Sequence, residues 1–296
     1  MKKLLIMVIL ISCCNIYIKT ISTYCPQNNK ENEMKKNKTC CACANKKKNQ
    51  TTDTAINKVY SDIAQGNISS FGGKSCGCKT KISQDIGYSR EEIDALADAN
   101  LGLGCGYPIN LGDIQKGSTI LDLGSGAGLD CFLAARKVGS TGKVIGVDAS
   151  EAMVKKAQEN KLKYGYSNVE FLLGDIENLP IQDNSIDIII SNCVLSLAKN
   201  KENAFKEAYR VLKTNGKMYV SDIVLIAPLS TEQQQDKSLI GTCALSAILK
   251  KDYLEKLSNT GFEIIISGED TTVNITKYNN NNLPVVSLKY IAIKPN

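Results

Sequence analysis

The chain has 296 residues, 43% of them hydrophobic, and a formal net charge of +6, so it is long enough for one α/β domain with extensions or for two small domains. It contains no histidine and no tryptophan but twelve cysteines, which excludes Ser-His-Asp and Cys-His catalysis and leaves carboxylates, hydroxyls, amides and sulfur for its chemistry. Residues 1–60 hold eleven Lys and three acidic residues, so the remainder is close to neutral. Because that remainder shows no basic stripe, we expect no nucleic acid among the partners.

An apolar leader, residues 1–24, opens the chain. Met1-Lys2-Lys3 precedes an apolar run from Leu4 to Ile11, and Ser12-Cys13-Cys14 follows, a pattern that resembles a secretory signal or a bacterial lipoprotein cleavage box. The run is shorter than the ~20 residues that span a bilayer. The leader therefore predicts a signal-like or anchoring segment, which makes membrane association or export the alternative to a cytoplasmic location.

A tether and an N-terminal cap are expected next. Residues 25–53 are rich in Asn, Lys and Thr without helical or strand periodicity, which predicts disorder, although the Cys40-Cys41-Ala42-Cys43 cluster could bind a soft metal. Residues 54–110 are expected to form the cap, with a helix over 55–64, a loop carrying Cys76-Gly77-Cys78, and a helix over 89–99. Ser89 is the expected N-cap of that last helix because Glu92 follows three residues later.

Residues 111–296 alternate strands with helices. Strands are expected over 119–123, 143–148, 168–173, 186–192, 216–224, 262–267 and 285–293, and helices over 129–138, 150–164, 201–212 and 251–260. Apolar runs such as Ile186 to Ile190 are typical of parallel strands covered on both faces. Asn-rich residues 274–282, rather than a helix, are expected between the last two strands, which favours an antiparallel final strand. The pattern predicts an α/β fold with a seven-stranded doubly wound Rossmann-like sheet, an N-terminal extension and a small C-terminal elaboration.

A glycine-rich turn follows the first expected strand, in the run Ile120-Leu-Asp-Leu-Gly-Ser-Gly-Ala-Gly128. Gly124, Gly126 and Gly128 allow a tight turn and close approach to a ligand, and Asp148 ends the next strand where it can accept hydrogen bonds from ribose hydroxyls. The turn resembles the first motif of class I S-adenosylmethionine-dependent methyltransferases. The alternative is a glycine-rich loop that binds nothing.

Later strand ends add candidate cofactor residues. Asp175 and Ile176 follow the third strand, where they can contact the amine and ring of an adenine, although Asp175 could equally be an exposed turn carboxylate. Asn192 ends the fourth strand, either where the methyl donor meets its acceptor or as a partner for strand-end backbone groups. The complete candidate cofactor set is Asp122, Gly124, Ser125, Gly126, Gly128, Asp148, Asp175, Ile176 and Asn192.

Cysteines occur at four places that this fold would bring over the cofactor: Cys76 or Cys78, Cys105, Cys193 and Cys243. They are far apart in sequence and none has the C-x-x-C spacing of a zinc knuckle, so any joint site would be assembled in three dimensions. Cys131, inside the first crossover helix, is better explained as a small buried hydrophobic residue.

Four stretches of the chain resemble the motifs of arsenite S-adenosylmethionine methyltransferases, with a match that runs in order from about Ile56 to Gly268. The stretches are Asn100 to Gly106 (NLGLGCG), Asp122 to Leu133 (DLGSGAGLDCFL), Ser191 to Leu195 (SNCVL) and Gly241 to Leu245 (GTCAL). The resemblance implies that thiolates of Cys105, Cys193 and Cys243 hold trivalent arsenic. It also implies that Cys76 or Cys78 serves in thiol exchange.

The same resemblance implies arsenite and methylarsenite as substrates, S-adenosylmethionine as methyl donor, and a thiol reductant of the glutathione or thioredoxin type. Arsenic(III) is soft and prefers sulfur, and its lone pair can attack the methyl group without loss of a proton, so a histidine-free site suits this reaction. We expect a cytoplasmic monomer that detoxifies arsenic, because a domain that uses S-adenosylmethionine and reduced thiols favours the cytoplasm over the export that the leader suggests. The alternatives are a small-molecule C- or N-methyltransferase of the same fold and a non-catalytic thiol protein that binds metalloids.

Overall fold

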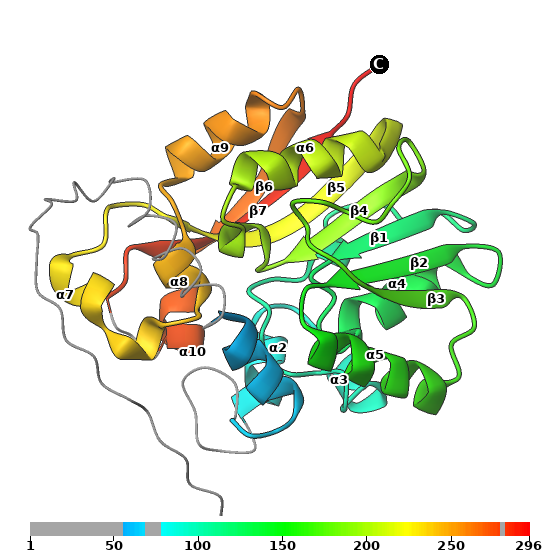
Figure 1. Ribbon diagram of the computed structural model, residues 1–296, viewed down its shortest axis with the longest axis horizontal. Helices are drawn as coiled ribbons and strands as arrows, with labels where there is room; N and C mark the ends of the chain where they lie inside the picture. The colour runs from blue at the N-terminus through cyan, green and yellow to red at the C-terminus, as the bar shows by residue number, and fades with distance from the viewer. Residues whose placement is uncertain (1–55, 69–77, 279–281) are drawn as a thin grey trace, which may run out of the picture.

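The computed structural model describes residues 56–68, 78–278 and 282–296 (Figure 1). The expected leader over 1–24, the tether over 25–53 and Cys76 lie outside these ranges. Within them, no helix combines the length and apolar character needed to cross a membrane.

The described residues contain one seven-stranded sheet in the order β3-β2-β1-β4-β5-β7-β6. Strands β1 to β5 are parallel, and β7 is antiparallel to both β5 and β6, as the sequence predicts for the final strand. The strands are β1 (Thr119–Leu123), β2 (Lys143–Asp148), β3 (Val169–Leu173), β4 (Ile186–Asn192), β5 (Leu212–Leu225), β6 (Glu263–Asp270) and β7 (Val285–Ile293). All seven predicted strands are therefore present, with β5 starting four residues earlier than expected.

Helices cover both faces of the sheet, which is the doubly wound arrangement predicted from the sequence (Figure 1). Alternate residues of a strand point to opposite faces: Leu121 and Leu123 of β1 pack into one cluster, whereas Ile120 packs into the other. The first cluster is covered by α6 (Lys201–Val211) and α9 (Lys250–Ser258), and the second by α3 (Arg90–Ala95), α4 (Leu129–Val138) and α5 (Glu151–Tyr164).

Local signals fix the ends of these helices. Ser89 caps α3 in a capping box with Glu92, as predicted, although α3 ends at Ala95 rather than at residue 99. The Ser150 side chain accepts a hydrogen bond from the Met153 amide at the start of α5, and Gly165 ends that helix at φ 72°. These caps set α5 directly after β2 and so keep its first turn beside the carboxyl end of that strand.

Four α-helices in the described ranges were not predicted, and two of them are the short helices over residues 231–235 and 243–246. Residues 78–85, which followed the expected cysteine loop, form α2 (Cys78–Asp85). The expectation of no helix between the last two strands is wrong, because α10 (Val273–Tyr278) lies between β6 and β7. Its sequence, VNITKY, consists of weak helix formers, so burial of Val273 and Tyr278 rather than intrinsic propensity favours the helix.

A small lobe lies beyond the carboxyl ends of the parallel strands. It contains α7 (Thr231–Gln235), α8 (Cys243–Ser246) and α10, and the helix over residues 56–64 lies between it and the cap helix α2 (Figure 1). A third hydrophobic cluster holds the lobe against β5 and β7 through Ile223, Leu239, Ala244 and Val285. The lobe thus closes the sheet edge at which this fold binds ligands.

Candidate active site

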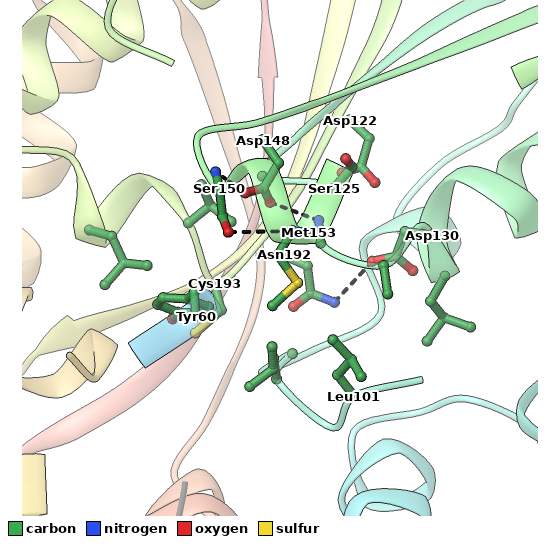
Figure 2. A pocket seen from close by; sticks show the side chains of 18 of the residues that line it. Tyr60, Leu101, Asp122, Ser125, Asp130, Asp148, Ser150, Met153, Asn192 and Cys193 are labelled. Carbon is green, nitrogen blue, oxygen red and sulfur yellow. Dashed lines mark hydrogen bonds between the residues drawn. The ribbon is translucent and has the colours of Figure 1, made fainter. Parts of the chain in front are cut away.

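A cavity of about 280 Å³ lies at the carboxyl ends of β1, β2 and β4. Figure 2 shows Asp148 and Ser150 on one side of it, Asp130 and Asn192 on another, and Cys193 with Tyr60 at one end. Eight of the nine predicted cofactor residues line it, all except Gly128: Asp122, Gly124, Ser125, Gly126, Asp148, Asp175, Ile176 and Asn192.

The three glycines of the turn have different surroundings. Gly124 also lines the cavity, but a Cβ there would lie 2.4 Å from the Val194 side chain. Gly126 has φ +52° and a Cβ would meet no atom within 4 Å, so this residue faces open space. Gly128 is the N-cap of α4 at φ 96°, and a Cβ there would meet Phe171 at 2.7 Å, so both the left-handed backbone and the packing favour glycine.

Asp148 is fixed by two backbone donors. Its Oδ2 accepts from the Gly126 amide at 2.9 Å and its Oδ1 accepts from the Ser150 amide at 2.8 Å. Burial raises the pKa of Asp148, and the two amide hydrogen bonds oppose that rise. The Ser125 hydroxyl beside it is buried and has no hydrogen-bond partner, so it can still bind a ligand.

A buried polar network lies on the opposite side. Asp130 accepts from the Tyr88 hydroxyl at 2.7 Å and from the Asn192 amide at 3.2 Å. Burial raises the pKa of Asp130 to about 6 despite these two hydrogen bonds. Burial and the nearby Asp130 also raise the pKa of Asp122, which accepts a hydrogen bond from the Cys131 thiol at 3.2 Å.

Asn192 connects this network to the Cys105 loop. Its Oδ1 accepts from the Cys105 amide at 3.0 Å, and its Nδ2 donates to the Gly106 carbonyl at 2.8 Å. The amide is therefore bonded to backbone groups, although these belong to the Cys105 loop and not to a strand end as the second interpretation from the sequence had it. A direct role toward the cofactor stays a prediction.

The loop after β3 lies at the rim of the cavity. Asp175 is exposed, and its Oδ1 accepts from the Glu177 amide at 2.9 Å in a local turn. Ile176 is half-buried and packs beside the first hydrophobic cluster. Adenine contacts for these two residues remain predictions.

Three of the predicted cysteines are buried together in the third hydrophobic cluster. Cys105, Cys193 and Cys243 are each at most 3% exposed. The Cys193 and Cys243 sulfurs lie 2.8 Å apart, and the Cys105 thiol is within hydrogen-bonding reach of Cys193. Cys193 alone of the three lines the cavity, so it joins the thiol cluster to the cofactor side of the site.

Each of these cysteines has a distinct local support. Cys193 follows β4 with φ 63°, an uncommon conformation for a residue with a side chain, and its amide donates to the Ser221 carbonyl at 2.8 Å. The Cys105 thiol donates to that same carbonyl at 3.4 Å. Cys243 begins α8, and its thiol donates to the Cys193 carbonyl at 3.2 Å.

The thiols form a packed cluster rather than an ion site. In the described ranges, no three His, Cys, Asp or Glu side chains have the arrangement that holds a metal ion. Burial raises the pKa of Cys193, and the contact with the Cys243 side chain together with the positive charge of Lys277 opposes that rise. The contact with Cys193, and then burial, raise the pKa of Cys243.

Two residues near the thiols were missed by sequence reasoning. Lys277 of α10 is 5% exposed and donates to the Cys193 sulfur at 3.0 Å. Tyr60, in the helix over 56–64, lines the cavity beside Cys193. No motif marks either residue, and Lys277 lies in the segment whose asparagines suggested a loop. Of the other predicted cysteines, Cys76 lies outside the described residues and Cys78 is the first residue of α2.

Comparison with known proteins agrees with this geometry. A family model described as a methyltransferase domain matches residues 114–261, which is half of the chain. The sheet order, the glycine turn and this match define a methyltransferase domain of the S-adenosylmethionine-dependent class.

Individual relatives give a more specific comparison than the family model. The chain is 43% identical over 196 residues to an arsenite methyltransferase of Halobacterium salinarum. The matched region covers 65% of this chain and 50% of the relative. It is 38% identical over 168 residues to an arsenite methyltransferase of Homo sapiens, covering 54% and 44% of the two chains. The solved structure of an arsenic(III) S-adenosylmethionine methyltransferase from Chlamydomonas reinhardtii matches with 30% identity and a TM-score of 0.57, over 70% of this chain and 75% of that one. The chain therefore belongs to the arsenite methyltransferase family, and it spans about half the length of the curated relatives it matches.

Proposed function

We propose that the chain transfers methyl groups from S-adenosylmethionine to trivalent arsenic held by the thiols of Cys105, Cys193 and Cys243. The products are methylated arsenicals, and the reaction detoxifies arsenic. One observation carries the proposal: three cysteines that are distant in sequence are buried together at the end of a cavity that begins at the glycine turn.

The residues around the cavity fit a nucleoside methyl donor. The Ser125 hydroxyl is buried without a partner, and Gly126 leaves the space in front of the turn open. Asp148 is oriented by two amides and retains lone pairs that can accept hydrogen bonds from ribose hydroxyls. Asp175 and Ile176 would flank the adenine. When bound, S-adenosylmethionine supplies a methyl group activated by its sulfonium charge.

The thiol cluster binds the substrate. Arsenic(III) is soft and prefers sulfur ligands, and each thiol can replace one hydroxyl of arsenite, with the thiol proton leaving with that hydroxide as water. The Cys105 and Cys243 thiols, which now donate to carbonyls, turn toward the arsenic that Cys193 holds. The arsenic lone pair then faces the cavity, and no general base is required. The chain contributes positioning and exclusion of water.

Delivery of arsenite, reduction of the thiols and the cellular location complete the proposal. Cys76 or Cys78 passes arsenite to the buried cluster, and a reductant of the glutathione or thioredoxin type keeps the thiols reduced. Methylarsenite is a second substrate. The chain acts as a cytoplasmic monomer, with a leader over 1–24, a tether over 25–53, a cap over 54–110 and the methyltransferase domain over 111–296.

The test uses the full chain with arsenite, S-adenosylmethionine and a thiol reductant, and separates arsenic species by chromatography with elemental detection. Methylated arsenicals are expected from the wild type. Cys193→Ser should abolish them while S-adenosylmethionine affinity is retained. Cys131→Ser is the matched control, because Cys131 is equally buried but contacts Asp122 instead of the thiol cluster.

The result also separates the alternatives. Folded wild-type protein that binds S-adenosylmethionine without methylating arsenite would point to a small-molecule C- or N-methyltransferase. Arsenite binding that persists without methylation, and that does not depend on Asp148, would point to a non-catalytic metalloid-binding protein. Wild-type activity in Cys193→Ser would remove that residue from the site.

A further inference from the structure

Lys277 is a buried lysine that points into the thiol cluster. Its ammonium group donates to the Cys193 sulfur at 3.0 Å, to the Leu103 carbonyl at 2.7 Å and to the Gly104 carbonyl at 3.4 Å. The side chain is 5% exposed. One cation therefore contacts both the sulfur that lines the cavity and the loop that presents Cys105.

A buried ammonium group is costly unless its surroundings compensate for lost water. No carboxylate in the described part of the chain is bonded to Lys277. The titratable groups that interact with it are the three thiols of the cluster and the hydroxyl of Tyr60. Burial lowers the pKa of Lys277, and the charges that the nearby thiols and Tyr60 carry when ionised raise it by more.

The position of Lys277 matters because its three acceptors come from segments that are distant in sequence. Leu103 and Gly104 precede Cys105, whereas Cys193 follows β4. Cys193 also has the strained φ of 63°, so its sulfur needs external support to keep one direction. The Cys105 and Cys243 thiols donate to backbone carbonyls, and Cys193 is the cysteine whose sulfur receives a cation.

We propose that Lys277 is a positioning residue of the arsenic site, which fixes the Cys193 sulfur relative to the Cys105 loop so that all three thiols reach one arsenic atom. This inference rests on the proposed function. It assigns Lys277 no contact with the reacting methyl group. Its loss should weaken arsenite capture and leave the cofactor half of the site unchanged.

A purely structural lysine is available for comparison at the opposite edge of the sheet. Lys294 donates to the Leu212 carbonyl at 2.7 Å and to the Tyr209 carbonyl at 2.8 Å. Its ammonium group also donates to the Asn184 side chain and lies 4.7 Å from the centre of the Tyr209 ring. It shares the two-carbonyl bonding of Lys277 but contacts no sulfur. Lys294→Met is therefore the matched control for removal of a carbonyl-bonded ammonium group.

The experiment compares full-length wild type, Lys277→Met, Lys277→Arg and Lys294→Met. Arsenic X-ray absorption counts the sulfur neighbours of substoichiometric arsenite, in the absence of S-adenosylmethionine. Three are expected in the wild type and in Lys294→Met, and two in Lys277→Met. In turnover, Lys277→Met should raise the KM for arsenite about tenfold, the effect of one lost charge-assisted hydrogen bond, with kcat and S-adenosylmethionine affinity nearly unchanged. Lys277→Arg should restore the third sulfur.

Three sulfur neighbours and an unchanged KM in Lys277→Met would overturn the proposal, as would a Lys277→Arg variant as impaired as Lys277→Met. If Lys277→Met loses S-adenosylmethionine binding, Lys277→Gln takes its place, because glutamine removes the charge but keeps a hydrogen-bond donor. The number of sulfur neighbours of arsenic in Lys277→Gln then decides whether the proposal stands. Because that count needs no turnover, a wild type that binds arsenite through three sulfurs without methylating it would refute the proposed function and still test Lys277.

Discussion

The approach of the Cys105 loop to β5 leaves no room for a side chain at Gly106. An ideal Cβ at this position would lie 2.4 Å from the Ser221 Oγ and 2.5 Å from its Cβ. Gly106 does not have a positive φ, so alanine would strain the backbone only through this contact. Because ordinary contacts begin near 3.4 Å, Gly106→Ala must displace the loop or the strand by about 1 Å.

The displacement has a predictable size and effect. Overpacking of a buried site costs about 1 to 3 kcal/mol, which should lower the melting temperature by roughly 3 to 10 °C in a domain of this size. A 1 Å misplacement of a reacting group can reduce turnover by about 100-fold. Since Asp148 and the glycine turn are untouched, S-adenosylmethionine affinity should change less than about twofold.

The assay combines thermal unfolding, S-adenosylmethionine titration and arsenite turnover. Gly268→Ala is the control, because a Cβ at Gly268 meets nothing within 4 Å and that variant should match the wild type. Adding Ser221→Gly to Gly106→Ala removes both clashing atoms, and the Ser221 hydroxyl has no partner to lose, so most activity should return. Full stability and turnover in Gly106→Ala alone would refute the claim that this contact positions Cys105.

Three further predictions concern separate parts of the chain. Asp148→Ala should weaken S-adenosylmethionine binding by about 10- to 100-fold in calorimetry, through loss of charge-assisted hydrogen bonds worth about 1.5 to 3 kcal/mol each; unchanged affinity would remove Asp148 from the ribose site. Asp130 has a pKa of about 6, above the unfolded value near 4, so the folded state holds its proton more tightly and stability declines as pH rises from about 4 to about 6. In urea unfolding between these pH values, Asp130→Asn should remove up to about 3 kcal/mol of the decline in unfolding free energy. If the wild type and Asp130→Asn lose stability in parallel as the pH rises, the raised pKa of Asp130 is wrong. Arg210→Met should lower the free energy of unfolding by roughly 1 to 3 kcal/mol, because Arg210 donates to the Leu179 and Ile181 carbonyls. S-adenosylmethionine affinity is the control and should be unchanged in this variant.

The cofactor half of the site could be predicted because its residues are close in sequence. The strand, the glycine turn and α4 are contiguous, and Asp148 ends the next strand, so the chain order itself places them together. The same locality explains the correct prediction of the Ser89 capping box. Gly128 is not among the residues that line the cavity, and a Cβ there would meet Phe171 at 2.7 Å, so cofactor contact at Gly128 stays a prediction.

The thiol half is different because it depends on contacts between distant segments. The predicted fold placed Cys105, Cys193 and Cys243 over the cofactor, but their spacing left their roles open, and the resemblance to a family was needed to assign them. Lys277 carried no signal, because its partners are a loop residue and a sulfur far away in the chain, and α10 forms from residues with low helix propensity. Long-range packing, rather than a local pattern, determines both the helix and the direction of its lysine.

Asn192 shows how the two halves depend on each other. Its side chain accepts from the Cys105 amide and donates to the Gly106 carbonyl, so it holds both sides of the cysteine that the glycines at 104 and 106 bring close to the strand ends. The same amide donates to Asp130, in the first turn of the helix that begins at the glycine turn. A shift of α4 must therefore move the Cys105 loop or break one of these hydrogen bonds. The Asn192 side chain, at the end of the central strand β4, therefore couples the first turn of α4 to the loop that carries Cys105.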